Sequence, residues 1–408
     1  MKIRWMLVCV LVVMLVWLPL TAHAQDEIPQ DTVTDEDVDD AIADEIEENI
    51  ETALTSADLH ALESFYEEYG ETLAPITGGR DFKSFLKMLA TGGADFNIGD
   101  IFGMVLNAMM AGVRQSIPAI VQIVVIGLLF SVITHFKPAF GETGVSKAAQ
   151  TAQFVIVGAI TLGVLTSAFH IGVSAIANMT AFTKELFPLL LALLTALGGI
   201  SSASILSPAT VFLTTGISLF FNDFILPLVI VLTVFTLVNN FSSTVKLSGF
   251  CSLIKSVIKW SVGICSTIFV GIVAMQGLLG STFDGLSIKT AKYAIDKMVP
   301  IIGGLFSNSV DVLLSCSLLI KNAVGIAGIL IIAAIVIAPV FAILAHYFLF
   351  KLCAAVLEPT AGEKMGQFMQ GAADVVLMLF AAVLASAVMF FITIGVIIGA
   401  GNANVMLR

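Results

Sequence analysis

The chain has 408 residues, of which 58% are hydrophobic and 12% charged, and its mean hydropathy is +1.01. Soluble globular proteins carry about 25% charged residues, so the composition excludes that class and indicates an all-α protein that crosses a membrane several times. The net charge of −11 is uneven, because residues 25–79 hold 18 Asp and Glu with no Lys or Arg, whereas the chain from residue 80 onward is net positive. The sequence has no basic patch interleaved with aromatic residues, which argues against nucleic-acid binding.

Residues 1–24 have the three parts of a secretory signal peptide. Lys2 and Arg4 precede the apolar run Trp5–Leu20, and Ala22-His23-Ala24 forms an A-x-A cleavage site. An uncleaved first transmembrane helix is the alternative, but this run is shorter than the roughly 20 residues needed to cross. We therefore expect cleavage after Ala24 and delivery of the next segment outside the cytosol.

The acidic segment 25–79 is expected to be mainly helical. Apolar residues recur every four positions along a first helix, and a second, capped by residues 55–58, is expected to end at Gly70. The apolar positions are Val38, Ile42, Ile46, Ile50 and Leu54 in the first helix, and Leu59, Leu62, Phe65 and Tyr69 in the second. The acidic side is either a docking surface for a basic partner or a solvated face that repels anionic headgroups.

Residues 80–116 are expected to form amphipathic helices that lie in the membrane interface. The first carries Phe82, Phe85, Leu86 and Leu89 on one side, and Asp100 is a candidate cap for the second.

Residues 117–408 form the predicted polytopic membrane domain. Six apolar spans are expected, at Ile117–Phe136, Thr151–Ile176, Phe224–Phe241, Trp260–Gly280, Ala323–Phe350 and Val375–Ala400. Leu186–Ile200 and Ala203–Phe221, joined at Gly198-Gly199, either add two spans or form a re-entrant hairpin. The lysines of the loops 137–150 and 242–259 favour the cytosolic side for both, and if 301–320 does not cross, 351–374 also lies inside and the C-terminus outside.

The stretch 286–328 is the one part of the membrane domain that is dense in polar residues. Leu286–Val299 is predicted to be an interfacial helix with Lys289, Lys292 and Asp296 on its polar side, broken by Pro300 and Gly303-Gly304. A polar stripe follows, made up of Asn308, Asp311, Ser315 and Asn322, with Lys321 next to it. The stripe could line a water-filled path, seat against a partner helix or bond helices of this chain together, and Asp311 could carry a proton.

Catalytic and metal-binding patterns are missing from the sequence. There is no HExxH helix, GxSxG elbow or Walker lysine, and the five cysteines stand singly. We therefore expect no enzyme activity, no cofactor and no metal site.

Three runs, Ile288–Tyr293, Pro300–Gly303 and Ser317–Gly328, resemble the stage III sporulation protein AE family of endospore-forming bacteria, with support from Phe187–Leu193 and Ala400–Asn402. The likeness covers about Phe82–Arg408 and does not extend to the acidic segment.

The resemblance implies a multi-pass protein of the mother-cell membrane around the forespore. It implies a subunit of a channel or secretion-like complex, needed for late forespore gene expression and spore development. The implied partners are the lipid bilayer, the other stage III sporulation A-operon membrane proteins and, through them, a partner in the forespore membrane. The alternative is a stand-alone secondary transporter of a small solute, which broken helices around Pro188, Pro208 and Pro300 would suit.

Overall fold

The computed structural model describes residues 59–93, 98–135, 143–241, 247–298 and 303–406. All of them belong to one compact unit, Asn49–Arg408, and every element within these ranges is a helix. The prediction of an all-α fold is confirmed. The expected signal peptide and the first acidic helix lie outside the described residues.

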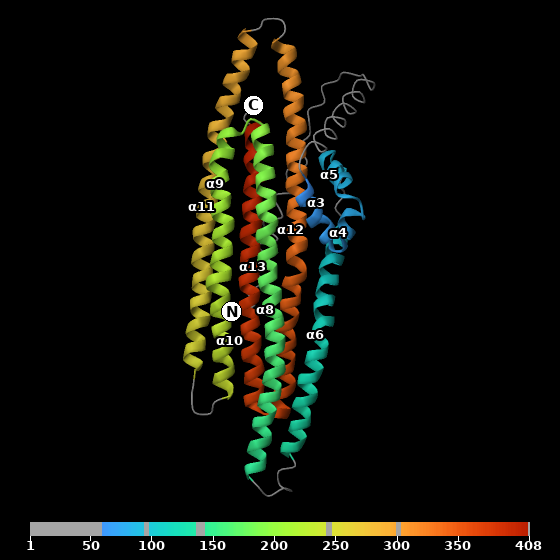
Figure 1. Ribbon diagram of the computed structural model, residues 1–408, viewed down its shortest axis with the longest axis vertical. Helices are drawn as coiled ribbons and strands as arrows, with labels where there is room; N and C mark the ends of the chain where they lie inside the picture. The colour runs from blue at the N-terminus through green and yellow to red at the C-terminus, as the bar shows by residue number, and fades with distance from the viewer. Residues whose placement is uncertain (1–58, 94–97, 136–142, 242–246, 299–302, 407–408) are drawn as a thin grey trace. The chain divides into compact units, whose positions relative to one another are not determined.

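Six rods of helix make up most of this unit (Figure 1). They are α6 (Ile98–His135), α8 (Thr143–Ala196), the continuous run of α9 (Ile200–Leu219), η1 (Phe220–Ile225) and α10 (Leu226–Phe241), then α11 (Ser248–Met298), α12 (Gly303–Ala361) and α13 (Glu363–Met406). Each contains a stretch long and apolar enough to cross a membrane, which confirms a polytopic membrane protein. At a rise of 1.5 Å per residue, the 59 residues of α12 extend for about 88 Å, nearly three times the thickness of a bilayer's hydrocarbon core.

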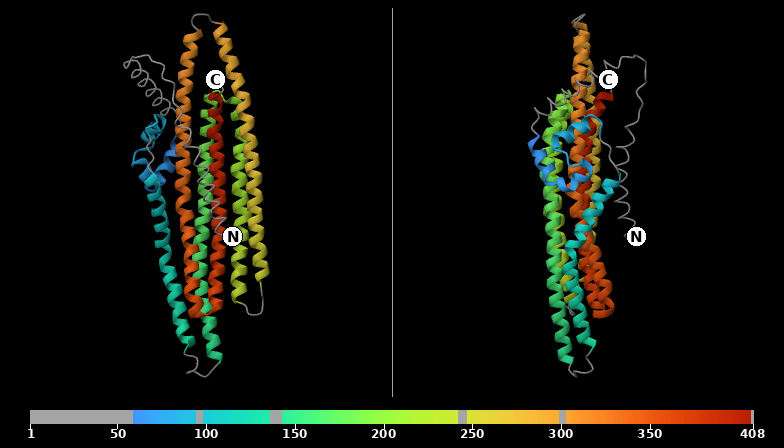
Figure 2. Two further views of the ribbon diagram at one scale, coloured as in Figure 1. Left: turned by 180° about the vertical axis from the view of Figure 1, so that it is seen from behind. Right: turned by 90° about the vertical axis from the view of Figure 1, so that its right-hand side faces the viewer.

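Successive rods run in opposite directions, as the views from the front and from behind both show (Figure 2). The helix ends that flank 136–142, 242–246 and Gly362 therefore lie toward one end of the unit. The α8–α9 turn and the last residue of α13 lie toward the other. This arrangement agrees with the expectation that the lysine-bearing connections share one side and that the C-terminus lies opposite.

The central pair of apolar segments does not add two spans. Leu186–Ile200 is largely the end of α8, and Ala203–Phe221 continues through η1 into α10. The chain reverses at Gly198, whose φ of 80° suits glycine, and the Gly199 N–H donates to the carbonyl of Leu194. The predicted turn is therefore present, but it joins two of the six rods.

The prolines inside the rods do not break the helices as the sequence suggested. Pro188 lies inside α8 and Pro208 inside α9, and both side chains are exposed, so neither ring is packed against a neighbouring helix. The π-helical turn η1 ends at Ile225, two residues before Pro227, where its wider backbone ring accommodates the proline in a continuous run of helix. The expectation of broken helices at Pro188 and Pro208 is therefore wrong.

Two predicted boundaries fall inside long helices. α6 begins at Ile98 and runs through residue 116, so Asp100 lies in its first turn and the second amphipathic helix is the start of the first span. α11 likewise joins Trp260–Gly280 to the amphipathic stretch and ends at Met298, one residue before the expected end. Lys255 and Lys259, expected in a loop, lie in the first turns of α11.

Helices α12 and α13 form the centre of the unit. Within an apolar window of 18 residues, 61% of residues are buried in each of these two helices, against 17% in α11. α12 packs against α13, α6 and α8, and α13 also contacts α10 and α11. The long helices on the outside therefore surround a central pair.

Along α8, buried residues alternate at intervals of four and three. This inner seam consists of Phe154, Gly158, Thr161, Leu165, Ala168, Gly172, Ala175, Met179, Phe182 and Leu186. A mean spacing of 3.5 residues is the repeat of left-handed helix packing. The seam contacts α13 through the Phe154–Phe368 ring pair and α12 through Leu186, which lies against Gly328.

Three short helices, α3 (His60–Glu68), α4 (Gly70–Thr77) and α5 (Phe82–Ala90), precede the rods. Leu59 and Leu62 are buried as the pattern predicted, but Gly70 begins α4 where the sequence predicted only a helix end. Asp81 caps α5 by accepting a hydrogen bond from the Ser84 N–H. The predicted apolar side of α5 is buried, namely Phe82, Phe85, Leu86 and Leu89.

Candidate functional site: polar contacts between the long helices

Lys321 is the most deeply buried charged residue that the structure describes. Its side chain is 0% exposed in α12, and its Nζ donates to the backbone carbonyl of Ile398 in α13 at 2.6 Å. One turn further, a Cβ on Gly325 would lie 2.6 Å from Cγ1 of Ile398, so α12 and α13 approach closely at this point. No described carboxylate lies within ion-pair distance of Lys321. Its bond therefore joins two central helices of this chain.

The remaining residues of the polar stretch are placed only in part. Ser315 is exposed and Asn322 half-buried on the same side of α12, while Lys321 turns toward α13. The Asn322 Oδ1 is buried without a partner among the described residues. Asn308 and Asp311 belong to helix α12, but their side chains lie outside the described part, so conduction and proton transfer stay predictions.

The interfacial residues Lys289, Lys292 and Asp296 are all within helix α11. Their side chains lie outside the described part of the structure. Their place in a membrane interface stays a prediction.

An ion pair joins α11 to α13. The Lys255 Nζ lies 2.6 Å from Oδ2 of Asp374, and both side chains are 24% exposed. Sequence reasoning missed this pair because it assigned Lys255 to a loop. The usable signal was a lysine a few residues before the apolar run Trp260–Gly280 and an aspartate directly before the run Val375–Ala400.

A second missed contact joins α6 to α12. The Oγ of Ser116 lies 3.2 Å from Nε2 of His346, and both residues are buried. The Nδ1 of His346 lies 2.6 Å from the carbonyl of Ala342 and therefore donates to it. A Cβ on Gly112 would lie 2.7 Å from the Cα of Ala342, so glycine permits the helices to meet here. The hydroxyl–imidazole contact thus sits in a closely packed helix crossing.

A hydrogen bond and an aromatic ring pair join the region of α3 to α8. Asn178 donates from Nδ2 to the Tyr69 hydroxyl at 2.9 Å, and the rings of Phe65 and Phe182 meet edge to face at 5.3 Å. The Tyr66 hydroxyl donates to the carbonyl of Arg80, and burial raises the pKa of the Tyr66 and Tyr69 phenols. The small helices therefore form a fixed cap on the rods.

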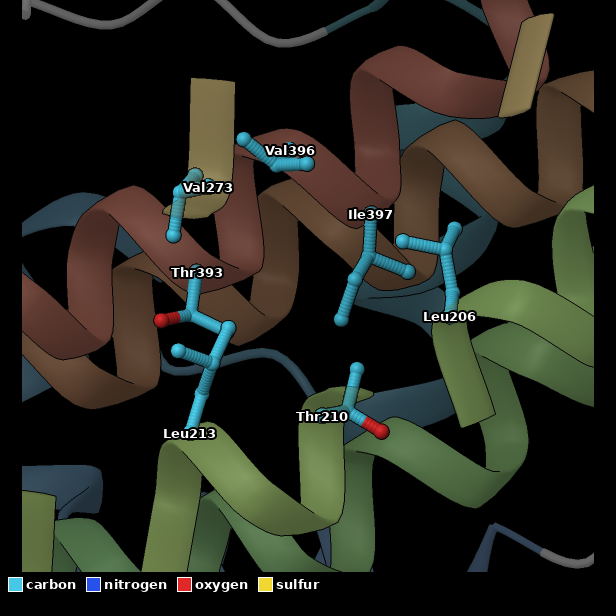
Figure 3. Close-up of a pocket in the computed structure, with 7 residues that line it drawn as sticks. All are labelled: Leu206, Thr210, Leu213, Val273, Thr393, Val396 and Ile397. Carbon is cyan, nitrogen blue, oxygen red and sulfur yellow. The ribbon is translucent and has the colours of Figure 1, made fainter. Parts of the chain in front are cut away.

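A narrow crevice lies among the helices that surround the C-terminal half of α13. It lies between α9, α11 and α13, lined by Leu206, Thr210, Leu213, Val273, Thr393, Val396 and Ile397 (Figure 3). The crevice is too narrow to hold a water molecule, and both threonine oxygens point away from its centre. No group of three His, Cys, Asp or Glu among the described residues is arranged to hold a metal ion.

Comparison with known proteins decides the family. The sequence model described as "Stage III sporulation protein AE" matches residues 80–401, which include every polar contact between the rods. The chain belongs to the stage III sporulation protein AE family. It is 31% identical over 281 residues to "Stage III sporulation protein AE" of Bacillus subtilis (strain 168), covering 69% of this chain and 70% of that protein. No solved structure matches the chain.

The family match begins at Arg80, just before α5. Helices α3 and α4 and the acidic segment precede it. The resemblance in 286–328 therefore identified the family correctly, and roles for 25–79 are not part of it.

Proposed function

We propose that this chain is a membrane subunit of a channel or secretion-like complex that links mother cell and forespore. The observation that carries the proposal is the family match over residues 80–401, which makes this a stage III sporulation protein. Six apolar helices, with the polar contacts Lys321–Ile398 and Lys255–Asp374 between α13 and its neighbours, support a multi-pass subunit.

In this proposal the protein resides in the mother-cell membrane around the forespore and has no catalytic role. Its partners are the other stage III sporulation A-operon membrane proteins and, through them, a forespore membrane protein. Late forespore gene expression and spore development depend on the assembly.

A stand-alone secondary transporter is less well supported. Such proteins bind solute at mid-membrane between discontinuous helices. Here α8 and α9 continue through their prolines as unbroken helices.

The direct test is deletion of the gene in its spore-forming host, scored as heat-resistant spores. We expect spore formation to fail after engulfment and to return when the full chain is supplied. Normal sporulation of the deletion strain would end the proposal.

The polar stretch is tested by Asp311→Leu in the complemented strain, with Asp223→Leu, an exposed aspartate of η1, as the matched control. We expect normal membrane amounts of both proteins and a loss of spores with D311L only, because a buried or water-facing carboxylate within a bundle is seldom neutral to its function. A wild-type spore count with D311L would remove Asp311 from the site.

A further inference from the structure

Helices α11 and α12 extend beyond the other described rods at the end of the unit where α13 ends. In all three views the last turns of α11 and the first turns of α12 stand clear of α8, α9 and α13 (Figure 1, Figure 2). Contacts between described residues fix how far each of the two helices extends.

The height of α12 is fixed by its contacts with α13. Lys321 and Gly325 of α12 both meet Ile398 of α13, through the hydrogen bond and the close approach described above. Beyond Ile398, α13 continues to Met406, which is about 12 Å at 1.5 Å per residue. In the same direction α12 continues from these contacts to Gly303, which is about 27–33 Å. α12 therefore extends about 15–20 Å beyond the end of α13.

The height of α11 is fixed by the crevice that it shares with α9 and α13. Val273 of α11 lines this crevice together with Val396 and Ile397 of α13 (Figure 3). From Val396 to its end at Met406, α13 continues for about 15 Å, whereas α11 continues for about 38 Å from Val273 to Met298. α11 therefore extends about 20 Å beyond the end of α13, and two separate sets of contacts agree on the overhang.

The turn between α8 and α9 also ends short of α12. Leu186 of α8 lies against Gly328 of α12. From this contact α8 continues for about 18 Å to the turn at Gly198, whereas α12 extends for about 38 Å to Gly303. The projecting helix ends, residues 284–298 of α11 and 303–312 of α12, therefore pass beyond the other described rods. We call these two helix ends the stalk.

The stalk begins where the apolar run of α11 ends. The sequence has no charged residue between Lys259 and Asp284, and this run of 24 residues is about 36 Å long as a helix, enough to cross the hydrocarbon core. Lys289, Lys292 and Asp296 follow within the stalk. Such residues are costly inside a bilayer and ordinary in water. The sequence therefore becomes polar at the height where the other rods end.

We propose that the stalk stands in water beyond the lipid headgroups, on the extracytosolic side of the membrane. A helix in the plane of the interface would have to turn away from the rod near residue 286, and α11 continues without a break to Met298. The sequence places lysines in the connections at the opposite end of the rods, which favours the cytosol for that end. The polar stretch is then reached from the aqueous phase outside the cell. This inference goes beyond the proposed function and does not depend on it.

Cysteine labelling in intact spheroplasts of a bacterium that forms no spores tests the position of the stalk. Lys292→Cys in the full-length chain should react with a maleimide that does not cross membranes, because a thiolate forms in water and not in lipid. Ile268→Cys, on an exposed apolar face of α11, should show roughly tenfold less label, close to the background of the native cysteines. Lys364→Cys, exposed at the opposite end of the rods, should react only after the spheroplasts are broken. No labelling of K292C in intact spheroplasts, or labelling only after they are broken, would overturn the proposal.

Fluorescence quenching from the headgroups measures the height of the stalk. Thr282→Cys and Lys297→Cys are each labelled with a fluorophore in a chain whose native cysteines are replaced by alanine, and the protein is reconstituted with lipids that carry a nitroxide on the headgroup. Position 297 lies about 22 Å beyond position 282 along α11, so quenching should be roughly threefold weaker at 297. Equal quenching at both positions would show that this part of α11 lies along the interface, and the stalk would be ruled out.

Discussion

Replacing Lys321 by methionine separates the cost of burying a charge from the benefit of its bond. Methionine keeps the length and volume of the side chain but cannot donate to the Ile398 carbonyl. A hydrogen bond from a charged donor contributes about 1.5–3 kcal/mol, whereas removing an ammonium from water costs several kcal/mol. The carbonyl keeps its bond within α13, because that helix continues to Met406. We therefore expect K321M to unfold within about 3 °C of the unaltered protein, measured by thermal scanning in detergent.

Two further variants at the same site fix the interpretation. Lys321→Ala leaves a cavity between α12 and α13 and should cost about 2–5 kcal/mol, as truncation of a buried long side chain does. Lys321→Glu sets a carboxylate against a carbonyl oxygen and should be the least stable of the three. If K321M is as unstable as K321E, the ammonium itself holds the helices together and the reasoning from desolvation is refuted.

Three other contacts lead to predictions about stability. Gly112→Val places carbon atoms within 2.7 Å of an α12 backbone atom and should lower the free energy of unfolding by about 1–3 kcal/mol, whereas Gly103→Val on the same helix meets open space. The two variants are compared by the fraction of monodisperse protein after extraction, and equal fractions would contradict the close helix crossing. Asp374→Ala strands the Lys255 ammonium and should cost about 1–2 kcal/mol, and the exchange K255D/D374K should restore most of it; a thermal scan that shows no restoration would argue against the ion pair. Tyr66→Phe removes one hydrogen bond, and a loss of about 1 kcal/mol should appear as faster proteolysis near α3; an unchanged cleavage rate would show that the bond is not needed.

Local signals in the sequence located the turns of this fold. Gly198-Gly199 marked the reversal between α8 and α9, and the Pro300 region marked the end of α11 at Met298. Both are stops that backbone chemistry imposes, because glycine adopts a positive φ and proline lacks an N–H. The apolar content likewise predicted six spans without reference to tertiary contacts.

Continuity of the helices was harder to predict. Hydropathy separates an apolar span from the polar stretch that contains Lys289 and Lys292, yet both belong to α11. A helix requires only that its backbone hydrogen bonds are made, so it can continue through a change of side-chain polarity. Pro208 lies within α9 with its side chain exposed, and whether its ring meets a neighbouring helix depends on the position of α9 in the fold.

The bonds between rods depend on register, which one sequence does not contain. Lys255 and Asp374 stand 119 positions apart, and only the relative height of α11 and α13 brings them to 2.6 Å. The sequence did not reveal the burial of Lys321, because the neighbouring Asn322 suggested a single polar side of α12. In the structure Lys321 faces α13, whereas Ser315 and Asn322 share another side.

The inner seam of α8 constrains how this helix can change in length. Removing seven residues turns everything beyond the cut by only about 20°, so the inner seam stays nearly aligned, whereas removing three turns it by about 60°. A three-residue deletion would therefore move the buried side chains beyond the cut toward one edge of the buried face. Length changes of seven residues within α8 should disturb its packing less than changes of three.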